Sequence, residues 1–219
     1  MSALFRLIII SITLLSCTVA RYETYPPYPD ATYAVASWYG PDFHGRPTAS
    51  GEIFNMHAFT CAHREYPFGT KLKVTNISNN RTVSCLINDR GPFIDGRDLD
   101  LSYAAAKEIG IIEPGTCTVR IEYLGRDTAY VRQVADISNV GPFTIQVGSF
   151  KELSNAFRLK MALELKHNKV YITEADINGS RYYRVRIGKL FKKDEANSLA
   201  QSLANEGYGI LITGYEEKI

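Results

Sequence analysis

The segment Asn88-Asp89-Arg90-Gly91-Pro92-Phe93 lies within the most distinctive stretch of the chain, residues 50–102. That stretch also contains Ser50-Gly51-Glu52, Ala62-His63 and Asp98-Leu99-Asp100-Leu101-Ser102. Acidic and imidazole side chains therefore recur there among glycine, proline and aromatic residues. A soluble core does not need that chemistry, whereas a polysaccharide cleft does, so we take residues 50–102 as the candidate functional region.

The sequence around this region has the pattern of short strands with one helix. The helix is expected over residues 102–110, because Ser102 can cap its N-terminus and Gly110 can end it. The strands expected at residues 70–76 and 82–88 flank a polar turn at residues 78–81, and this arrangement predicts a β-hairpin. Many short strands with one helix indicate a small closed barrel over residues 31–126. Strands are expected at residues 33–39, 70–76, 82–88 and 116–124.

A series of motifs extends along this part of the chain. They are Ala36-Ser37-Trp38-Tyr39-Gly40, Thr48-Ala49-Ser50-Gly51-Glu52, Ala62-His63, Val74-Thr75-Asn76, Asn88-Asp89-Arg90-Gly91-Pro92-Phe93 and Asp100-Leu101-Ser102-Tyr103-Ala104-Ala105-Ala106. Their order resembles that of the rare lipoprotein A (RlpA) family. The resemblance implies a mainly-β double-psi β-barrel of six strands and one short helix, related to expansins and family-45 endoglucanases.

The resemblance also implies an activity. Characterised members of the family are lytic transglycosylases, which cut peptidoglycan between N-acetylmuramic acid and N-acetylglucosamine and leave a 1,6-anhydro end. They prefer glycan strands stripped of stem peptides. Because the 6-hydroxyl of the sugar is itself the nucleophile, one carboxyl can act first as acid and then as base, unlike the carboxylate pair of ordinary glycosidases. Such a proton donor needs a raised carboxyl pKa, or a His near its natural range.

The family motifs assign roles to four residues. We expect Asp89 to be the acid/base, His63 its proton partner and Glu52 a substrate-orienting or second carboxylate, with Asp100 as a reserve acid. Each has a structural alternative. Asp89 can be a turn residue, Asp100 a helix cap, His63 a structural hydrogen bonder and Glu52 a solvated carboxylate. Arg90 can pair with Asp89 or Asp100, or meet a sugar carboxyl.

The cysteines leave few options for a metal. No CxxC pair occurs, so a zinc site is not expected, and no cofactor is implied. Cys61 and Cys85 stand where relatives are expected to have small or aliphatic residues, and we hypothesise that they pair across neighbouring strands. Cys117 would then be left over.

The first thirty residues indicate export. Arg6 precedes a brief apolar run that is too short for a comfortable membrane span, and residues 1–16 predict a signal peptide. Leu14-Leu15-Ser16-Cys17 resembles the bacterial lipobox, in which the Cys is lipidated. Residues 17–30 are rich in proline and tyrosine and predict an extended tether. We therefore expect an outer-membrane lipoprotein that faces the periplasm.

Residues 127–140 are expected to be a short linker, and a second domain follows at residues 141–219. Its strands and helices predict the order βαββαβ, an α+β fold in which two helices cover one face of a four-stranded sheet. Strands are expected at residues 142–148, 170–175, 182–188 and 208–213, and helices at residues 151–167 and 194–205.

This second pattern resembles the SPOR domain, through Ile145-Gln146-Val147-Gly148-Ser149-Phe150 and Tyr182-Tyr183-Arg184-Val185-Arg186-Ile187-Gly188. SPOR domains bind denuded glycan where the wall divides, which implies septal division proteins as partners. The matching glycan-binding positions are Gln146, Ser149, Tyr182 and Arg184.

Two functions remain open at this point. The resemblance favours an endolytic transglycosylase, and the alternative is a non-catalytic septal adaptor that holds glycan. Nucleic acid is not expected as a partner, because the net charge is only +2 and the aromatic RNA-binding signature is missing.

Overall fold

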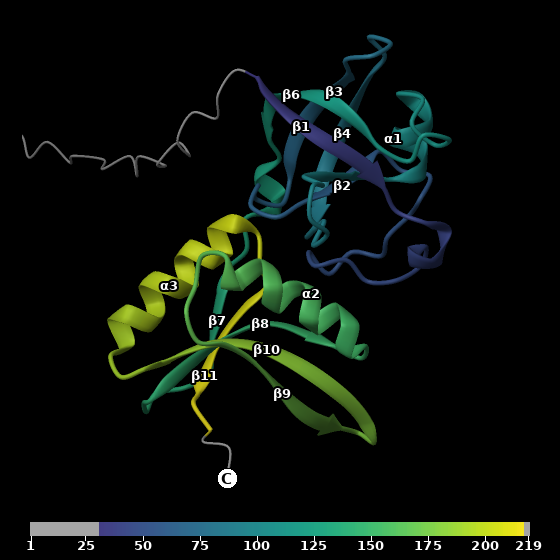
Figure 1. The fold of residues 1–219 in the computed structure, drawn as a ribbon. Coiled ribbons are helices and arrows are strands. Elements are labelled where there is room, and N and C mark those ends of the chain that lie inside the picture. Colours follow the sequence, from purple (N-terminus) through teal and green to yellow (C-terminus); the bar gives the residue numbers. More distant parts are fainter. Residues whose placement is uncertain (1–30, 217–219) are drawn as a thin grey trace, which may run out of the picture.

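The computed structural model describes residues 31–216, which form a closed barrel followed by an open sheet with two covering helices (Figure 1). The predicted signal peptide, Cys17 and the tether lie outside the described residues. Within residues 31–216, no helix combines the length and the apolar composition needed to cross a membrane.

The barrel has six strands, as predicted, and they close in the order β1-β5-β2-β4-β3-β6. Two of them were not predicted as individual strands, because β2 has only 4 residues and β5 only 3. A period of two cannot be recognised over so few positions. The strands are β1 (Thr32–Trp38), β2 (Thr60–His63), β3 (Thr70–Asn76), β4 (Thr82–Asp89), β5 (Leu99–Leu101) and β6 (Cys117–Arg126).

The predicted hairpin is β3 and β4, which pair antiparallel with Leu72 opposite Cys85. Leu72 and Val74 are fully buried in the barrel, as their alternation suggested. Cys85 is joined to Cys61 of β2 by a disulfide with a Cα–Cα distance of 5.9 Å. The hypothesised pairing is therefore present, and it ties two strands of the barrel wall together.

The short helix of the barrel is α1 (Tyr103–Glu108), and Ser102 is its cap. The Ser102 Oγ accepts a hydrogen bond from the backbone N–H of Ala105 at 3.2 Å. Gly110 follows the helix with φ of +74°, a conformation that glycine adopts most readily. The capping role that the sequence left open for Asp100 is thus filled by Ser102.

The second sheet contains the predicted βαββαβ order, with one correction. It has five strands in the order β7-β11-β8-β10-β9, because residues 134–136 of the expected linker form a strand parallel to β11. A three-residue strand has no readable alternation and depends on pairing with a distant strand. The elements are β7 (Val134–Asp136), β8 (Phe143–Phe150), α2 (Leu153–Glu164), β9 (Val170–Ile177), β10 (Ser180–Leu190), α3 (Lys193–Glu206) and β11 (Ile210–Gly214).

Both helices pack on the same face of this sheet and bury most of the apolar positions at helical spacing, but Leu153 at the start of α2 is 41% exposed and Leu199 is only partly buried. Gly148 of β8 allows α2 to approach closely, since a Cβ there would lie 2.8 Å from the Leu159 side chain and 2.7 Å from the Phe150 ring. The helix layer lies between the barrel and the sheet, so the other face of the sheet points away from the barrel (Figure 1). The buried helix residues are Ala156, Leu159, Leu163, Ala196, Ala200 and Leu203.

The two halves of the chain are in direct contact. The backbone N–H of Phe68 donates to the carbonyl of Glu206 at 3.0 Å, and that of Arg132 donates to the carbonyl of Ala204 at 3.0 Å. These bonds attach the C-terminal end of α3 both to the barrel and to the connecting segment. That segment also contains a 3-10 turn, η2 (Thr128–Tyr130), so it is structured along part of its length.

Candidate active site

The candidate site begins at the end of β4, where a loop from earlier in the chain lies against the strand. The backbone N–H of Ala49 in this loop donates to Asp89 Oδ1 at 2.8 Å. Asn88 Nδ2 donates to Glu52 Oε2 at 2.7 Å. The loop therefore contacts both residues at the end of β4, Asp89 through the backbone of Ala49 and Asn88 through the Glu52 carboxylate.

Asp89 is buried, with only 5% of its surface exposed. Its Oδ1 accepts hydrogen bonds from the backbone N–H groups of Ala49 and Arg90, both at 2.8 Å. Burial raises the pKa of the Asp89 carboxyl, although Arg158 and the two N–H groups act in the opposite direction. A raised carboxyl pKa is what a proton donor working near neutral pH requires.

Asp100 of β5 lies two strands from Asp89 of β4, at the same level of the barrel wall. Ala62 of β2 is opposite Asp89 on one side and opposite Asp100 on the other. Asp100 is engaged by two donors, the Ser37 hydroxyl and Arg97 Nη2, and the ion pair with Arg97 measures 2.5 Å. Both contacts fall on the same carboxylate oxygen of Asp100, Oδ1, whereas Asp89 Oδ1 is held by backbone N–H groups.

Tyr39, from the motif Ala36-Ser37-Trp38-Tyr39-Gly40, lies near both carboxylates. Its hydroxyl is buried and has no hydrogen-bond partner among the described residues. Burial, with Asp89 and Asp100 nearby, raises the pKa of the Tyr39 phenol well above its usual value. A buried hydroxyl without a partner is costly and is available for a ligand oxygen.

His63 is held by the backbone. Its Nδ1 accepts from the N–H groups of Glu65 at 3.0 Å and Tyr66 at 3.1 Å. Burial and the nearby Arg90 lower the pKa of His63 to about 3, so the ring is neutral at physiological pH. The hydrogen bonds among residues 31–216 include none between His63 and Asp89. The structure thus shows the structural role that the sequence left open for His63.

Glu52 is fixed at both carboxylate oxygens. Its Oε2 accepts from Asn88, and its Oε1 accepts from the Tyr130 hydroxyl at 2.5 Å. Tyr130 belongs to η2, in the segment expected to be a linker. Burial and the Glu52 carboxylate raise the pKa of the Tyr130 phenol. Glu52 is therefore an oriented carboxylate and not a freely solvated one.

Arg90 does not use its guanidinium to pair with Asp89 or Asp100, the partners considered from sequence. It is 2% exposed, and its Nε donates to the Tyr208 hydroxyl at 2.7 Å. The guanidinium also stacks 3.8 Å above the centre of the Phe68 ring. Because Tyr208 follows α3, Arg90 fastens the second domain at the residue next to Asp89.

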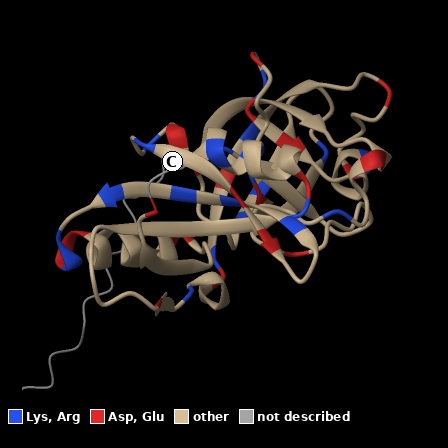
Figure 2. Cartoon of the chain, turned by 90° about the horizontal axis from the view of Figure 1, so that it is seen from below, with Lys and Arg blue, Asp and Glu red and all other residues tan. Residues whose placement is uncertain are grey.

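The four residues predicted to bind glycan lie on the second sheet. Tyr182 and Arg184 alternate along β10 with the buried Val185, and Ser149 of β8 is opposite Arg184. Gln146 is opposite Arg186 across the same pair of strands. This register places the four predicted side chains on the face of the sheet opposite α2 and α3. Lys and Arg positions recur along the chain in this domain (Figure 2).

Arg186 on this face was not predicted as a binding residue. It is 2% exposed, and its Nη1 lies 3.7 Å from Glu216 Oε2. Its Nε and Nη1, and the Nε of Arg184, have no hydrogen-bond partner among the described residues. The alternation Tyr182, Arg184, Arg186 was the available sequence signal, since residues i, i+2 and i+4 share one face of a strand.

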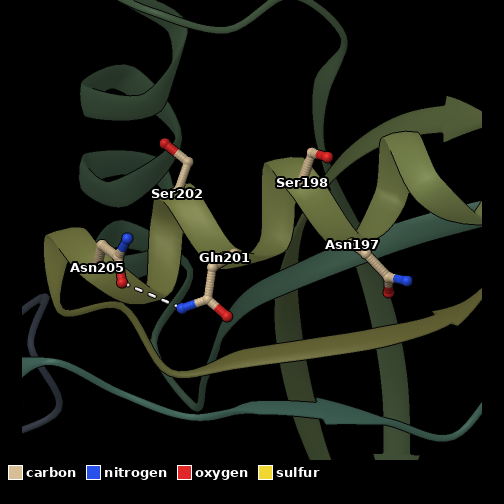
Figure 3. Close-up of a pocket in the computed structure, with 5 residues that line it drawn as sticks. All are labelled: Asn197, Ser198, Gln201, Ser202 and Asn205. Atoms are coloured by element: carbon tan, nitrogen blue, oxygen red, sulfur yellow. Dashed lines mark hydrogen bonds between the residues drawn. The ribbon is translucent and has the colours of Figure 1, made fainter. Parts of the chain in front are cut away.

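Other features of the surface are separate from this site. Within residues 31–216, no three His, Cys, Asp or Glu side chains gather as a metal-ligand set. One polar depression lies on α3, away from Asp89, where Gln201 donates to Asn205 at 3.1 Å (Figure 3). Its other lining residues are Asn197, Ser198 and Ser202.

Comparison with known proteins agrees with this architecture. Residues 32–121 match a family model described as a lytic transglycolase, and residues 139–212 match the SPOR domain. A Campylobacter jejuni protein named endolytic peptidoglycan transglycosylase RlpA is 36% identical over 206 residues, which cover 85% of this chain and 74% of that protein. The chain belongs to the RlpA family.

Two further RlpA proteins bear the same name. The relative from Vibrio cholerae is 36% identical over 79% of this chain and 65% of its own length. The relative from Haemophilus influenzae is 40% identical over 78% of this chain and 57% of its own length. This chain therefore spans somewhat more than half to about three quarters of the RlpA proteins it matches.

The RlpA motifs led to Asp89, Glu52 and His63, but not to all the residues around them. Arg158 of α2 places its Nη1 3.8 Å from Asp89 Oδ2. Tyr130 holds Glu52 from the connecting segment. Both come from outside the barrel sequence, and no local pattern indicates such long-range contacts.

Proposed function

We propose that this protein is an endolytic lytic transglycosylase that cleaves peptidoglycan strands stripped of stem peptides and leaves 1,6-anhydro-N-acetylmuramic acid ends. The observation that carries the proposal is the buried, oriented Asp89 carboxyl with its raised pKa. The protonated carboxyl donates its proton to the glycosidic oxygen as the bond to the anomeric carbon breaks. The resulting carboxylate then accepts the proton of the 6-hydroxyl as that oxygen bonds to the anomeric carbon.

The neighbouring residues have defined parts in this scheme. Glu52, fixed by Asn88 and Tyr130, supplies a negative charge beside the positive charge that develops at the anomeric carbon. His63 has Nδ1 committed to the backbone, so Nε2 is the nitrogen left for its proposed part as proton partner of Asp89. Asp100 remains the reserve acid.

The second domain holds the same polymer. RlpA proteins with a SPOR domain are peptidoglycan-associated proteins of the cell envelope. We further propose that Gln146, Ser149, Tyr182 and Arg184 grip the stripped strand through amide, hydroxyl and guanidinium groups and a flat ring. The finer assignments, septal targeting with division proteins and an outer-membrane anchor at a lipidated Cys17, rest on the sequence motifs.

Mass spectrometry of soluble products tests the enzyme. The mature protein is incubated with stripped glycan and with intact peptidoglycan, beside Asp89→Asn and the matched control Asp95→Asn, an exposed aspartate of the same barrel. We expect anhydro-ended fragments from stripped glycan with the parent and with Asp95→Asn, and a loss of at least 100-fold with Asp89→Asn. Cleavage that survives Asp89→Asn would refute the assignment of the acid.

A non-catalytic adaptor is the second candidate. It is favoured by the contact of Arg158 with Asp89, which leaves the side chain of the acid only 7% exposed. In that case the parent protein is retained on stripped glycan in a sedimentation assay but releases no anhydro products.

A further inference from the structure

Helix α2 of the SPOR domain carries a cation into the candidate active site of the barrel. Arg158 Nη1 lies 3.8 Å from Asp89 Oδ2, and the guanidinium carbon lies 5.3 Å from the centre of the Phe43 ring. Phe43 belongs to η1 (Pro41–Phe43), a short turn of the barrel domain. A single SPOR side chain thus contacts both the proposed acid and an aromatic residue beside it.

The position of Arg158 is set by contacts on both domains. Its Nη2 donates to Asn155 Oδ1 at 2.6 Å, one turn earlier on α2. Just after α2, Lys166 Nζ donates to the carbonyl of Glu65 in the barrel domain at 3.4 Å, and beyond α3 the bond from Arg90 to Tyr208 holds the same domain against the barrel. Arg158 is therefore oriented and is not a freely moving surface side chain.

The guanidinium has capacity for a further anion. At 3.8 Å, the contact with Asp89 is an ion pair and not a hydrogen bond. Among residues 31–216, Asn155 is the one hydrogen-bond acceptor that Arg158 reaches, although a guanidinium has five N–H donors. The Arg158 side chain remains 26% exposed, so a ligand can reach it from solvent.

We propose that Arg158 is a specificity-determining residue of the glycan-cleaving site, where it binds the lactyl carboxylate of a muramic acid residue next to the bond that is cut. This inference rests on the proposed function. A stripped strand carries that carboxylate free, whereas in a peptide-bearing strand it is consumed in an amide. A planar guanidinium suits a free carboxylate and has little to gain from the neutral amide.

Binding of the substrate carboxylate also changes the acid. Arg158 and Asp89 attract one another, and a second carboxylate competes for the same cation. The other groups facing Asp89 are Arg90, whose guanidinium is engaged by Tyr208, and the neutral Tyr39. When Arg158 turns to the substrate, Asp89 loses the larger of the two cationic influences that lower its pKa, those of Arg158 and Arg90, and takes up a proton more readily. The stripped strand thereby places the acid in its active form.

The test compares Arg158→Gln and Arg158→Lys with the control Lys160→Gln, which removes a charge from the same helix at a residue that pairs with Glu164. The substrates are stripped glycan, intact peptidoglycan, and stripped glycan whose muramic carboxyls have been reduced to alcohols. We expect Arg158→Gln to lose about 10-fold or more in kcat/KM on stripped glycan. Carboxyl reduction should lower the activity of the parent by a similar factor and hardly affect the variant.

The pH profile supplies a readout that a structural role would not move. Asp89 must be protonated, so kcat/KM falls as pH rises through its pKa in the free enzyme. Removing Arg158 raises that pKa, and the alkaline limb should move to higher pH in Arg158→Gln but not in Lys160→Gln. An unmoved limb, or an equal response of both proteins to carboxyl reduction, would overturn the inference.

Binding separates this inference from the proposed function. If the parent releases no anhydro products, the enzyme proposal fails, and Arg158 is judged by affinity alone. Because the SPOR sheet face would also bind glycan, affinity for the barrel site is measured in proteins in which that face is weakened by Arg184→Ala. The affinities for stripped and for carboxyl-reduced glycan are compared in Arg184→Ala and in Arg184→Ala combined with Arg158→Gln. Equal preference for the free carboxylate in both proteins would refute the role of Arg158.

Discussion

Removing the Tyr208 hydroxyl tests whether Arg90 fastens the two domains. In Tyr208→Phe, the Nε–H of Arg90 loses its acceptor at 2.7 Å in a site where Arg90 is 2% exposed. Its Nη2 already has no partner among the described residues, so the variant leaves two donors of a buried cation unpaired. A hydrogen bond to a charged group contributes about 1.5–3 kcal/mol, and we expect the free energy of unfolding to fall by that amount.

The assay is denaturant and thermal unfolding followed by circular dichroism. For a chain of this size, the expected loss lowers Tm by about 3–12 °C. Tyr33→Phe is the control, because Tyr33 is 68% exposed and its change should stay within about 0.5 kcal/mol. Small-angle scattering should show a larger radius of gyration for Tyr208→Phe. A stability equal to that of the control, with an unchanged radius, would refute the reasoning.

Two other perturbations follow from the same barrel. Cys61→Ser combined with Cys85→Ser removes a disulfide with a sequence separation of 24. The loop-entropy model gives a decrease of about 3.5 kcal/mol in the free energy of unfolding, which urea unfolding measures. A free energy of unfolding equal to that of the parent would contradict this expectation. His63 has its folded pKa lowered to about 3, so between that pH and its unfolded value near 6.5 the unfolded state binds more protons. The free energy of unfolding should fall as pH drops through this window, by up to about 1.4 kcal/mol per pH unit. His63→Gln should reduce this dependence of the free energy of unfolding on pH. An unchanged dependence would show that His63 is not its source.

Much of the fold could be predicted from sequence because its signals are local. The β3–β4 hairpin follows from alternation around a polar turn, and the Ser102 cap and Gly110 from the chemistry of helix ends. The four main strands and two helices of the second domain were predicted in the right order. The strands that were missed, β2, β5 and β7, have only 3 or 4 residues and exist because longer strands pair with them.

The candidate site divides in the same way. Motif residues such as Asp89 and Glu52 were found because each belongs to a short, recognisable segment. Their partners were not found, since Tyr130 and Arg158 lie 78 residues from Glu52 and 69 from Asp89 along the chain, and neither stands in a motif. The hydrogen bonds of His63 could not be predicted from sequence either, because they come from two backbone N–H groups of the following turn, which occupy Nδ1 and leave Nε2 free of them.

Under the two proposals, the placement of Arg158 allows one small domain to contribute to two sites. On α2, Ala156, Leu159 and Leu163 face the sheet, whereas Arg158 points to the barrel. The SPOR domain therefore docks through its helices and leaves the sheet face with Tyr182 and Arg184 uncovered (Figure 1). Docking through the sheet would have hidden the proposed glycan-binding side chains. Docking through the helices lets Arg158 reach the barrel site while the proposed glycan-binding face of the sheet stays accessible.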